Sequence, residues 1–209
     1  MADDKKHYVM NADPGKFGIV GGEAKGTLTD AHLNKRQMTR ERINFTHEKQ
    51  STNSAAWYAL AQSFNRAAYV LEKYRDEIPM DTRPFAFNAA LSLELVFKAV
   101  IASKSIPIPT NSDGHNLIAL CEAAAIPCSA DQLSTLELMT EELIWAGRYP
   151  TPNRSSKWDA FHDVVFEKHV VRSQLGNVTS VRVNPDTFPS WENYTKIWDL
   201  ASLELKALK

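Results

Sequence analysis

From about residue 54 onward, the apolar residues of this chain recur at a regular spacing that sets a strong limit on its fold. Between residues 54 and 76 the apolar positions alternate at steps of three and four, while polar residues fill the other faces. This period is typical of a helix that buries one stripe of side chains. The stripe expected to be buried consists of Trp57, Leu60, Phe64, Ala67, Leu71 and Tyr74.

Similar signals recur along the chain, so we predict an all-α fold, a bundle of five to six helices. Pro84 suits the first position of a second helix, which segment 85–103 continues. Because that segment is apolar on nearly every side, it is expected at the centre of the core. Ser112 or Asp113 is expected to cap a short third helix that ends before Pro127.

Two more helices are expected in the second half of the chain. Ser129 and Gln132 form a capping box that opens the fourth helix, and Gly147 is expected to end it. A fifth helix is expected to begin at a cap formed by Ser155 or Ser156. Together with the earlier segments, these helices account for most of the bundle.

Residues 170–183 carry a different pattern. Their β-branched valines flank the pair Gly176-Asn177, which predicts a small β-hairpin. Helical spacing then restarts after Ser190 and continues to Leu208, so a C-terminal helix is expected to complete the bundle.

The N-terminal part differs from the rest in composition. Five of the eight glycines fall between Gly15 and Gly26, and a polar stretch follows them. We therefore predict a flexible arm over residues 1–50 and a helical domain over 51–209, with a short surface helix between Asn34 and Glu48. The glycine cluster lacks the GxxxxGK[ST] order of a phosphate-binding loop.

Charge and cysteine content limit the classes of function. The chain has 24 Lys and Arg against 25 Asp and Glu, a net charge of -1, so contact with a nucleic acid must be local. Cys121 and Cys128 are expected to be buried reduced thiols, and no hydrophobic leader follows Met1. The apolar stretch 91–102 is shorter than a membrane span. These observations predict a cytoplasmic protein that does not enter a membrane.

Three residues near the core are candidates for a polar site. Glu94 and Lys98 stand one helical turn apart in an apolar helix, either as a structural ion pair or as the lining of a polar groove. His115 stands at the expected start of a helix, where it either satisfies backbone groups or acts as a general base.

A second candidate is the loop that follows the fourth helix. Arg148 either caps the carbonyl groups of that helix or binds phosphate, and Tyr149 either packs or joins it in binding. Farther on, His162 and His169 are seven residues apart, which spans about 10.5 Å of helix axis and is too far for one metal ion. No metal and no cofactor are expected.

These residues resemble the HEPN domain (higher eukaryotes and prokaryotes nucleotide-binding). The resemblance lies in segments 91–99, 114–120 and 145–150, and it covers about residues 54 to 170. It implies an all-α bundle, frequent homodimers, and roles in RNA cleavage, toxin–antitoxin pairs, phage defence or nucleotide binding. It also places Glu94, Lys98 and Arg148 in the motifs that carry it.

Members of that family that cleave RNA use an arginine followed after four to six residues by a histidine, without metal. Here Arg148 has no such partner, and Arg154 reaches His162 only across seven intervening residues. The leading interpretation is a module that binds RNA, a nucleotide or a protein partner such as an antitoxin, with a degenerate nuclease motif. The alternative is a metal-independent RNA endonuclease that uses Arg154 and His162, with His115 as a further candidate. A third is a structural or regulatory bundle whose arm recognises a protein.

Overall fold

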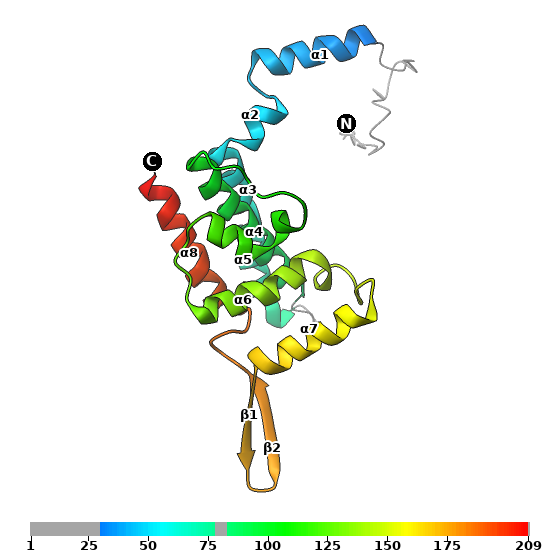
Figure 1. The fold of residues 1–209 in the computed structure, drawn as a ribbon, viewed down its shortest axis with the longest axis vertical. Helices are drawn as coiled ribbons and strands as arrows, with labels where there is room; N and C mark the ends of the chain where they lie inside the picture. The colour runs from blue at the N-terminus through cyan, green and yellow to red at the C-terminus, as the bar shows by residue number, and fades with distance from the viewer. Residues whose placement is uncertain (1–29, 78–82, 209) are drawn as a thin grey trace, which may run out of the picture. The chain divides into compact units, whose positions relative to one another are not determined.

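The computed structural model describes residues 30–77 and 83–208 of the chain. Among these residues it contains eight α-helices, three short 3₁₀ or π segments and one antiparallel hairpin before the C-terminal helix, which confirms the expected all-α class (Figure 1). The elements are α1 (Asp30–Arg42), α2 (His47–Ser51), α3 (Ser54–Lys73), η1 (Arg75–Glu77), α4 (Arg83–Ser103), η2 (Asn111–His115), α5 (Leu117–Ala123), α6 (Ala130–Glu141), η3 (Glu142–Ala146), α7 (Ser155–Lys168), β1 (Val170–Leu175), β2 (Val178–Val183) and α8 (Trp191–Ala207).

The chain divides into two compact units between His47 and Glu48. The described part of the first unit is dominated by α1, whose described side chains are all exposed. A short helix was expected between Asn34 and Glu48, and α1 covers the first part of that range. The glycine cluster between Gly15 and Gly26 lies outside the described residues.

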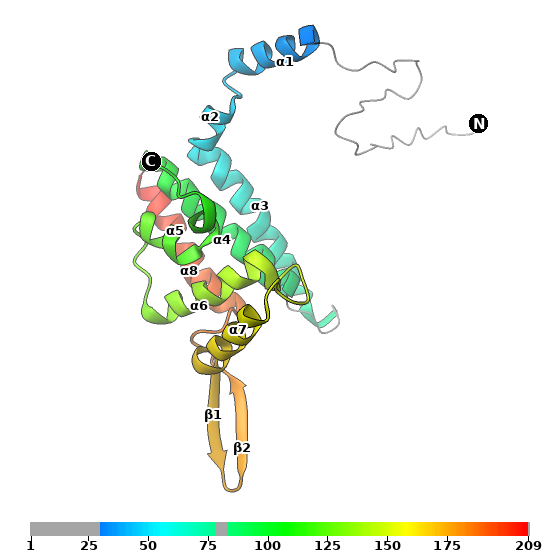
Figure 2. The same cartoon turned by 45° about the vertical axis from the view of Figure 1, so that its right-hand side comes forward.

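In the second unit, α4 is the central helix. It lies among the other helices in Figure 2 and contacts α3, α5, α6, η3 and α8. Most of its residues are buried, as its apolar sequence predicted. By length and composition α4 also reaches what a membrane span needs, although the shorter stretch 91–102 suggested otherwise. Because 78% of the apolar window is buried inside the protein, its apolar surface is covered by the other helices.

The face of α3 that packs on α4 differs from the stripe expected from its spacing. Leu60 and Tyr74 are 48% and 43% exposed, whereas Ala61 and Ala68 are fully buried. Small alanine side chains allow two helices to approach closely, so the buried face is centred on them. Trp57 and other large residues flank this contact and are only partly buried.

A buried tyrosine ties three helices of the second unit together. The Tyr194 hydroxyl of α8 lies 2.7 Å from Ser92 Oγ of α4 and donates to Asn65 Oδ1 of α3 at 2.8 Å. Its desolvation raises the pKa of the Tyr194 phenol well above its usual range. The hydroxyl therefore acts as a neutral hydrogen-bonding group that sets the positions of α3, α4 and α8.

The helix caps confirm one sequence prediction and correct two. The capping box is present: Ser129 Oγ accepts from the Gln132 amide at 3.3 Å, and Gln132 Oε1 accepts from the Ser129 amide at 2.8 Å. The prediction that Ser112 or Asp113 caps the third helix was wrong, because that segment forms the separate turn η2 and Asn116 caps α5. The N-cap of α7 is Arg154, not a serine, and its side chain forms no cap hydrogen bond.

Gly147 ends the fourth helix, as predicted, after its last turn has widened into the π segment η3. A Cβ atom at this position would lie 2.7 Å from the Glu142 carbonyl oxygen and 2.8 Å from Phe87 Cβ. The backbone of Gly147 therefore packs directly against α4, and the absence of a side chain permits that contact.

The predicted hairpin is confirmed, with Gly176 at a φ of 59° in its turn. In Figures 1 and 2 it extends away from the helices, and every side chain of β2 is exposed. Its base is held by hydrogen bonds among buried groups. His169 Nδ1 lies 3.1 Å from Thr187 Oγ1, and Thr135 Oγ1 of α6 donates to the Thr187 carbonyl at 2.9 Å.

Candidate functional site

Two charged residues of α4 lie within the core, because positions 94 and 98 share a helix face that the neighbouring elements cover. Lys98 Nζ donates to Glu94 Oε1 at 2.6 Å. The side chains are only 10% and 6% exposed, respectively. The favourable order of Glu before Lys explains the pairing, but its depth exceeds that of an ordinary surface ion pair.

His115 completes this arrangement from the end of η2. Its Nδ1 lies 3.0 Å from Glu94 Oε2, so each oxygen of that carboxylate has a partner. The imidazole is 62% exposed, although the carboxylate that it contacts is almost completely buried. We call Glu94, Lys98 and His115 the polar triad.

The backbone around His115 explains how it reaches α4. Gly114 is buried, and a Cβ there would lie 3.1 Å from the Pro109 carbonyl oxygen, so η2 folds closely onto the preceding loop. Asn116 then caps α5 by accepting from the amides of Ile118 and Ala119 at 3.0 and 3.2 Å. His115 is thus held between a tight turn and a capped helix, which limits the positions of its ring.

A fourth residue, Trp57 of α3, joins the triad. Lys98 Nζ lies 5.5 Å from the centroid of a Trp57 ring, within the range of a cation–π interaction. The Trp57 indole donates to the Ser51 carbonyl at 2.8 Å, which fixes the ring. Sequence reasoning assigned Trp57 only to an apolar stripe, and no local signal pairs it with Lys98.

Arg148 and Tyr149 form a separate exposed group after η3. The Arg148 guanidinium donates to the Ile144 carbonyl and lies 5.5 Å from the Tyr149 ring centroid and 5.9 Å from that of Phe87. Arg148 therefore caps the helix and also stacks on aromatic rings. Tyr149 is 55% exposed, so its ring is available to an external group.

The triad and Arg148 lie along one face of α4. Arg148 contacts Phe87, which stands seven residues before Glu94 in α4. Seven residues make about two turns of an α-helix, so Phe87 and Glu94 lie on the same face of α4. The axial separation between them is about 10.5 Å. The structure therefore places an exposed imidazole and an exposed guanidinium along the same helix.

Arg154 and His162 are not brought together in the same way. Arg154 is the exposed N-cap residue that precedes α7, while His162 lies eight positions later within that helix, about 12 Å along the axis. The His162 ring packs edge-on against Trp158 at 4.4 Å between centroids, and its Nε2 is buried without a hydrogen-bond partner. Within the described residues, no hydrogen bond joins Arg154 to His162.

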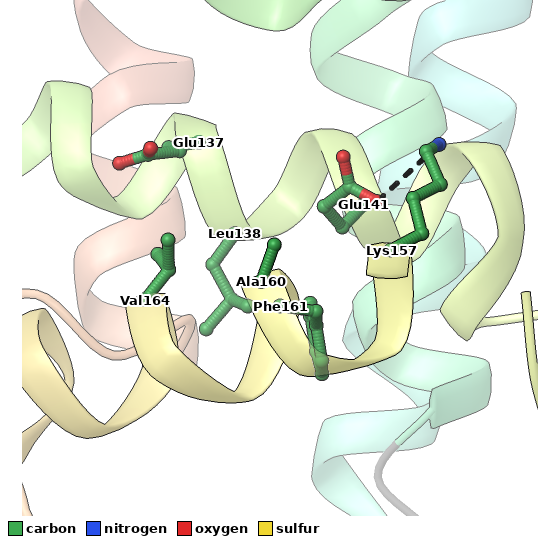
Figure 3. Close-up of a pocket in the computed structure, with 7 residues that line it drawn as sticks. All are labelled: Glu137, Leu138, Glu141, Lys157, Ala160, Phe161 and Val164. Carbon is green, nitrogen blue, oxygen red and sulfur yellow. Dashed lines mark ion pairs between the residues drawn. The ribbon is translucent and has the colours of Figure 1, made fainter. Parts of the chain in front are cut away.

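A pocket between α6 and α7 has a volume of about 140 Å³ (Figure 3). Figure 3 shows Lys157 facing Glu141, and the two form an ion pair at 3.9 Å. Pockets that enclose small ligands are usually about 300–1,000 Å³, so this one is too small for a nucleotide. It is lined by Glu137, Leu138, Glu141, Lys157, Ala160, Phe161 and Val164, none of which was a sequence-predicted site residue.

The part of the chain that the structure describes contains no cluster of three or more His, Cys, Asp or Glu side chains placed to hold a metal ion. Comparisons of the chain with protein-family models, curated proteins and solved structures find no match. The resemblance to the HEPN domain therefore stays a prediction from short motifs. To those motifs the structure adds a hydrogen bond between Glu94 and His115, which are 21 positions apart in the chain.

Proposed function

We propose that this chain is a HEPN-like module that binds RNA through the polar triad and the Arg148–Tyr149 group. The observation that carries the proposal is the Glu94–His115 hydrogen bond, in which a buried carboxylate orients an exposed imidazole. Removing two charges from water is costly, and apolar residues would fill the same space without that cost. Retaining a buried ion pair beneath an exposed histidine is best explained by recognition of a ligand.

The exposed groups suit single-stranded RNA. Its unstacked bases pack on aromatic rings and on arginine guanidinium planes, and its phosphates bind arginine. Arg148 and Tyr149 offer such a cation and ring, and His115 adds an imidazole on the same helix face. A single enclosed nucleotide is the weaker choice, because the pocket between α6 and α7 is too small for one and is not lined by these residues.

The biological setting and partners follow from the resemblance. We place the module in a defence or toxin–antitoxin type of system, with an antitoxin-like protein as a further partner and a homodimer as its assembly. Leu60 and Val70 on α3 and Tyr74 at its C-cap are 48%, 51% and 43% exposed, and such apolar side chains support a self-associating surface. Light scattering of the full chain would give the mass of the assembly, and a monomer at micromolar concentration would contradict the dimer.

Fluorescence anisotropy with a labelled mixed-sequence single-stranded RNA, at low salt and in EDTA, tests the binding proposal. Arg148→Glu is expected to abolish binding, and His115→Ala is expected to weaken it about tenfold, as expected for the loss of one stacking contact. Arg66→Glu changes another exposed arginine of the second unit and serves as the matched control. Unchanged affinity in Arg148→Glu, with weakened binding in the control, would contradict the proposed surface.

A metal-independent ribonuclease is the second candidate. One observation favours it: Nδ1 of His115 contacts Glu94. The other ring nitrogen, Nε2, is then left to take a proton from a ribose 2′-hydroxyl. Incubation with labelled RNA in EDTA distinguishes the possibilities. Cleavage lost in His162→Ala and Arg154→Ala would support that pair, whereas cleavage lost only in His115→Ala would support the Glu94–His115 dyad. Binding without cleavage would favour the binding module.

A further inference from the structure

The two cysteines of the chain lie side by side, although seven positions separate them. Cys121 is in the last turn of α5, and Cys128 directly precedes the cap of α6. Cys121 Sγ donates to Cys128 Sγ at 3.3 Å and also lies 3.6 Å from the Ile126 carbonyl oxygen. Both are free thiols; Cys121 is buried, whereas Cys128 is partly exposed.

The backbone between the cysteines holds the two sulfur atoms together. The Ile126 amide donates to the Cys121 carbonyl at 3.1 Å, and the Cys128 amide donates to the Ile126 carbonyl at 2.9 Å. Ala125 has a φ of 55°, an uncommon conformation for alanine that persists only where the surrounding structure requires it. The thiol contact is therefore a product of a defined turn.

The two thiols are chemically unequal. The hydrogen bond from Cys121 lowers the pKa of the Cys128 thiol, because it stabilises the Cys128 thiolate. The same hydrogen bond, together with burial, raises the pKa of Cys121. Since the thiolate is the reactive form, Cys128 is the attacking residue and Cys121 the one that resolves the reaction.

We propose that Cys121 and Cys128 form a reversible modification site, at which a low-molecular-weight disulfide such as glutathione disulfide converts the dithiol into an intramolecular disulfide. The inference does not depend on the proposed RNA function. It assigns a role to residues that the sequence alone predicted to be buried reduced thiols, of which Cys128 is in fact only partly buried.

The exchange proceeds in two balanced steps. The Cys128 thiolate attacks one sulfur of glutathione disulfide, whose S–S bond breaks, and a glutathione thiolate leaves. The Cys121 thiol then passes its proton to that thiolate, and its sulfur attacks Cys128 Sγ. The Cys128–glutathione S–S bond breaks, and the second glutathione leaves as a thiolate that takes up the proton Cys128 lost to water when it ionised. The two protein thiols are oxidised by two electrons, and one glutathione disulfide is reduced to two thiols.

The product would join the end of α5 to the start of α6. A disulfide bond is about 2.05 Å long, so the sulfur atoms must approach by about 1.2 Å from their separation of 3.3 Å. The closed loop contains eight residues, and such a crosslink restricts the unfolded chain. We expect the midpoint of thermal unfolding to rise by about 5 °C in the oxidised protein.

The test is titration of the reduced full chain with mixtures of reduced and oxidised glutathione, read by intact mass and by alkylation of free thiols. The wild type is expected to lose two hydrogens and both free thiols without retaining glutathione. Wild-type protein that keeps both thiols, or forms only intermolecular or glutathione disulfides, would overturn the proposal.

Two single variants test the assigned roles. In Cys121→Ala the mixed disulfide has no resolving thiol, so glutathione is expected to accumulate on Cys128. In Cys128→Ala the remaining thiol is buried, and adduct formation is expected to be about tenfold slower or more. Circular dichroism checks that both variants are folded. Equal rates of glutathione adduct formation in the two folded variants would contradict the assignment of Cys128 as the attacking residue.

Discussion

Glu94 shows how much a single buried carboxylate depends on its neighbours. Lys98 contacts one oxygen and His115 the other, and the Trp57 ring lies beside the ammonium group. The contribution of such a carboxylate to the stability of the protein depends on its partners. Removing one partner leaves an unpaired charge in a site from which water is largely excluded.

Lys98→Met is therefore expected to destabilise the protein by about 3–5 kcal/mol, because it leaves the Glu94 carboxylate without its cation. The double variant Glu94→Met with Lys98→Met is expected to recover most of that loss, since neither charge is then buried. Urea denaturation of the wild type, both single variants and the double variant measures the coupling. A Lys98→Met variant within about 0.5 kcal/mol of the wild type would show that the pair contributes little.

His169 at the base of the hairpin predicts a pH dependence of stability. Its side chain is fully buried, and desolvation lowers its pKa below the ordinary value near 6.5. The nearby charges are those of Glu137, which raises the pKa, and Lys168, which lowers it. The folded protein thus holds His169 neutral at a pH where the unfolded chain already binds a proton.

The stabilisation from neutral His169 is therefore complete above about pH 6.5 and is lost as the pH falls toward the folded-state pKa. The loss is at most about 1.4 kcal/mol per pH unit for one proton. Urea denaturation between pH 7.5 and 5 measures it, and His169→Gln is expected to reduce the slope. His47→Gln, at an exposed position, is expected to retain the wild-type slope, and equal slopes in all three proteins would contradict the assignment.

At the scale of elements, the segment around His115 shows that a cap depends on where a helix begins. Ser112 and Asp113 are suitable cap residues, but residues 111–115 form a 3₁₀ turn, and α5 begins only at Leu117. The side chain of Asn116 accepts from two amides that the helix itself leaves without partners. Because residues 111–115 form the turn η2, the cap of α5 is Asn116, and His115 at the end of the same turn contacts Glu94.

Asn116→Ala is expected to cost about 0.5–2 kcal/mol, because the part-buried amides of Ile118 and Ala119 at the start of α5 lose their acceptor. Ser112→Ala is the matched control and is expected to stay within about 0.5 kcal/mol of the wild type. Chemical denaturation gives both values. A larger loss for Ser112→Ala than for Asn116→Ala would support the cap that the sequence alone suggested.

At the scale of the whole molecule, the chain consists of two units that meet between His47 and Glu48. The second unit contains α4 and all the helices that contact it, so its core is complete without α1. The described side chains of α1 are exposed, and this helix adds no buried residue to the core.

A protein that begins at Glu48 is therefore expected to fold and to unfold cooperatively, with a melting midpoint close to that of the full chain. Circular dichroism during heating measures the transition. If the arm recognises a partner, as the structural or regulatory interpretation requires, this shortened protein keeps its fold and loses that binding. A broad, non-cooperative transition would show that residues 1–47 contribute to the core.

The agreement between sequence and structure is closest where the signals are local. The capping box at Ser129, the turn at Gly176 and the helical spacing each depend on residues within a few positions of one another, and all three are confirmed. The predictions for the face of α3 and the caps of α5 and α7 were wrong in detail. The buried face of α3 depends on α4, which packs on it, and each cap depends on the residue at which its helix begins.

The helical class, the hairpin and the position of most elements follow from local sequence signals, because hydrogen bonding and periodic burial within a segment suffice for these. Packing between segments sets the rest: Ala61 is buried in preference to Leu60, and His115 and Trp57 contact the Glu94–Lys98 pair. Those contacts join residues 21 and 41 positions apart, and no local pattern encodes them. They arise because packing α3 and η2 against α4 buries apolar surface, and the polar groups that it encloses must then find partners.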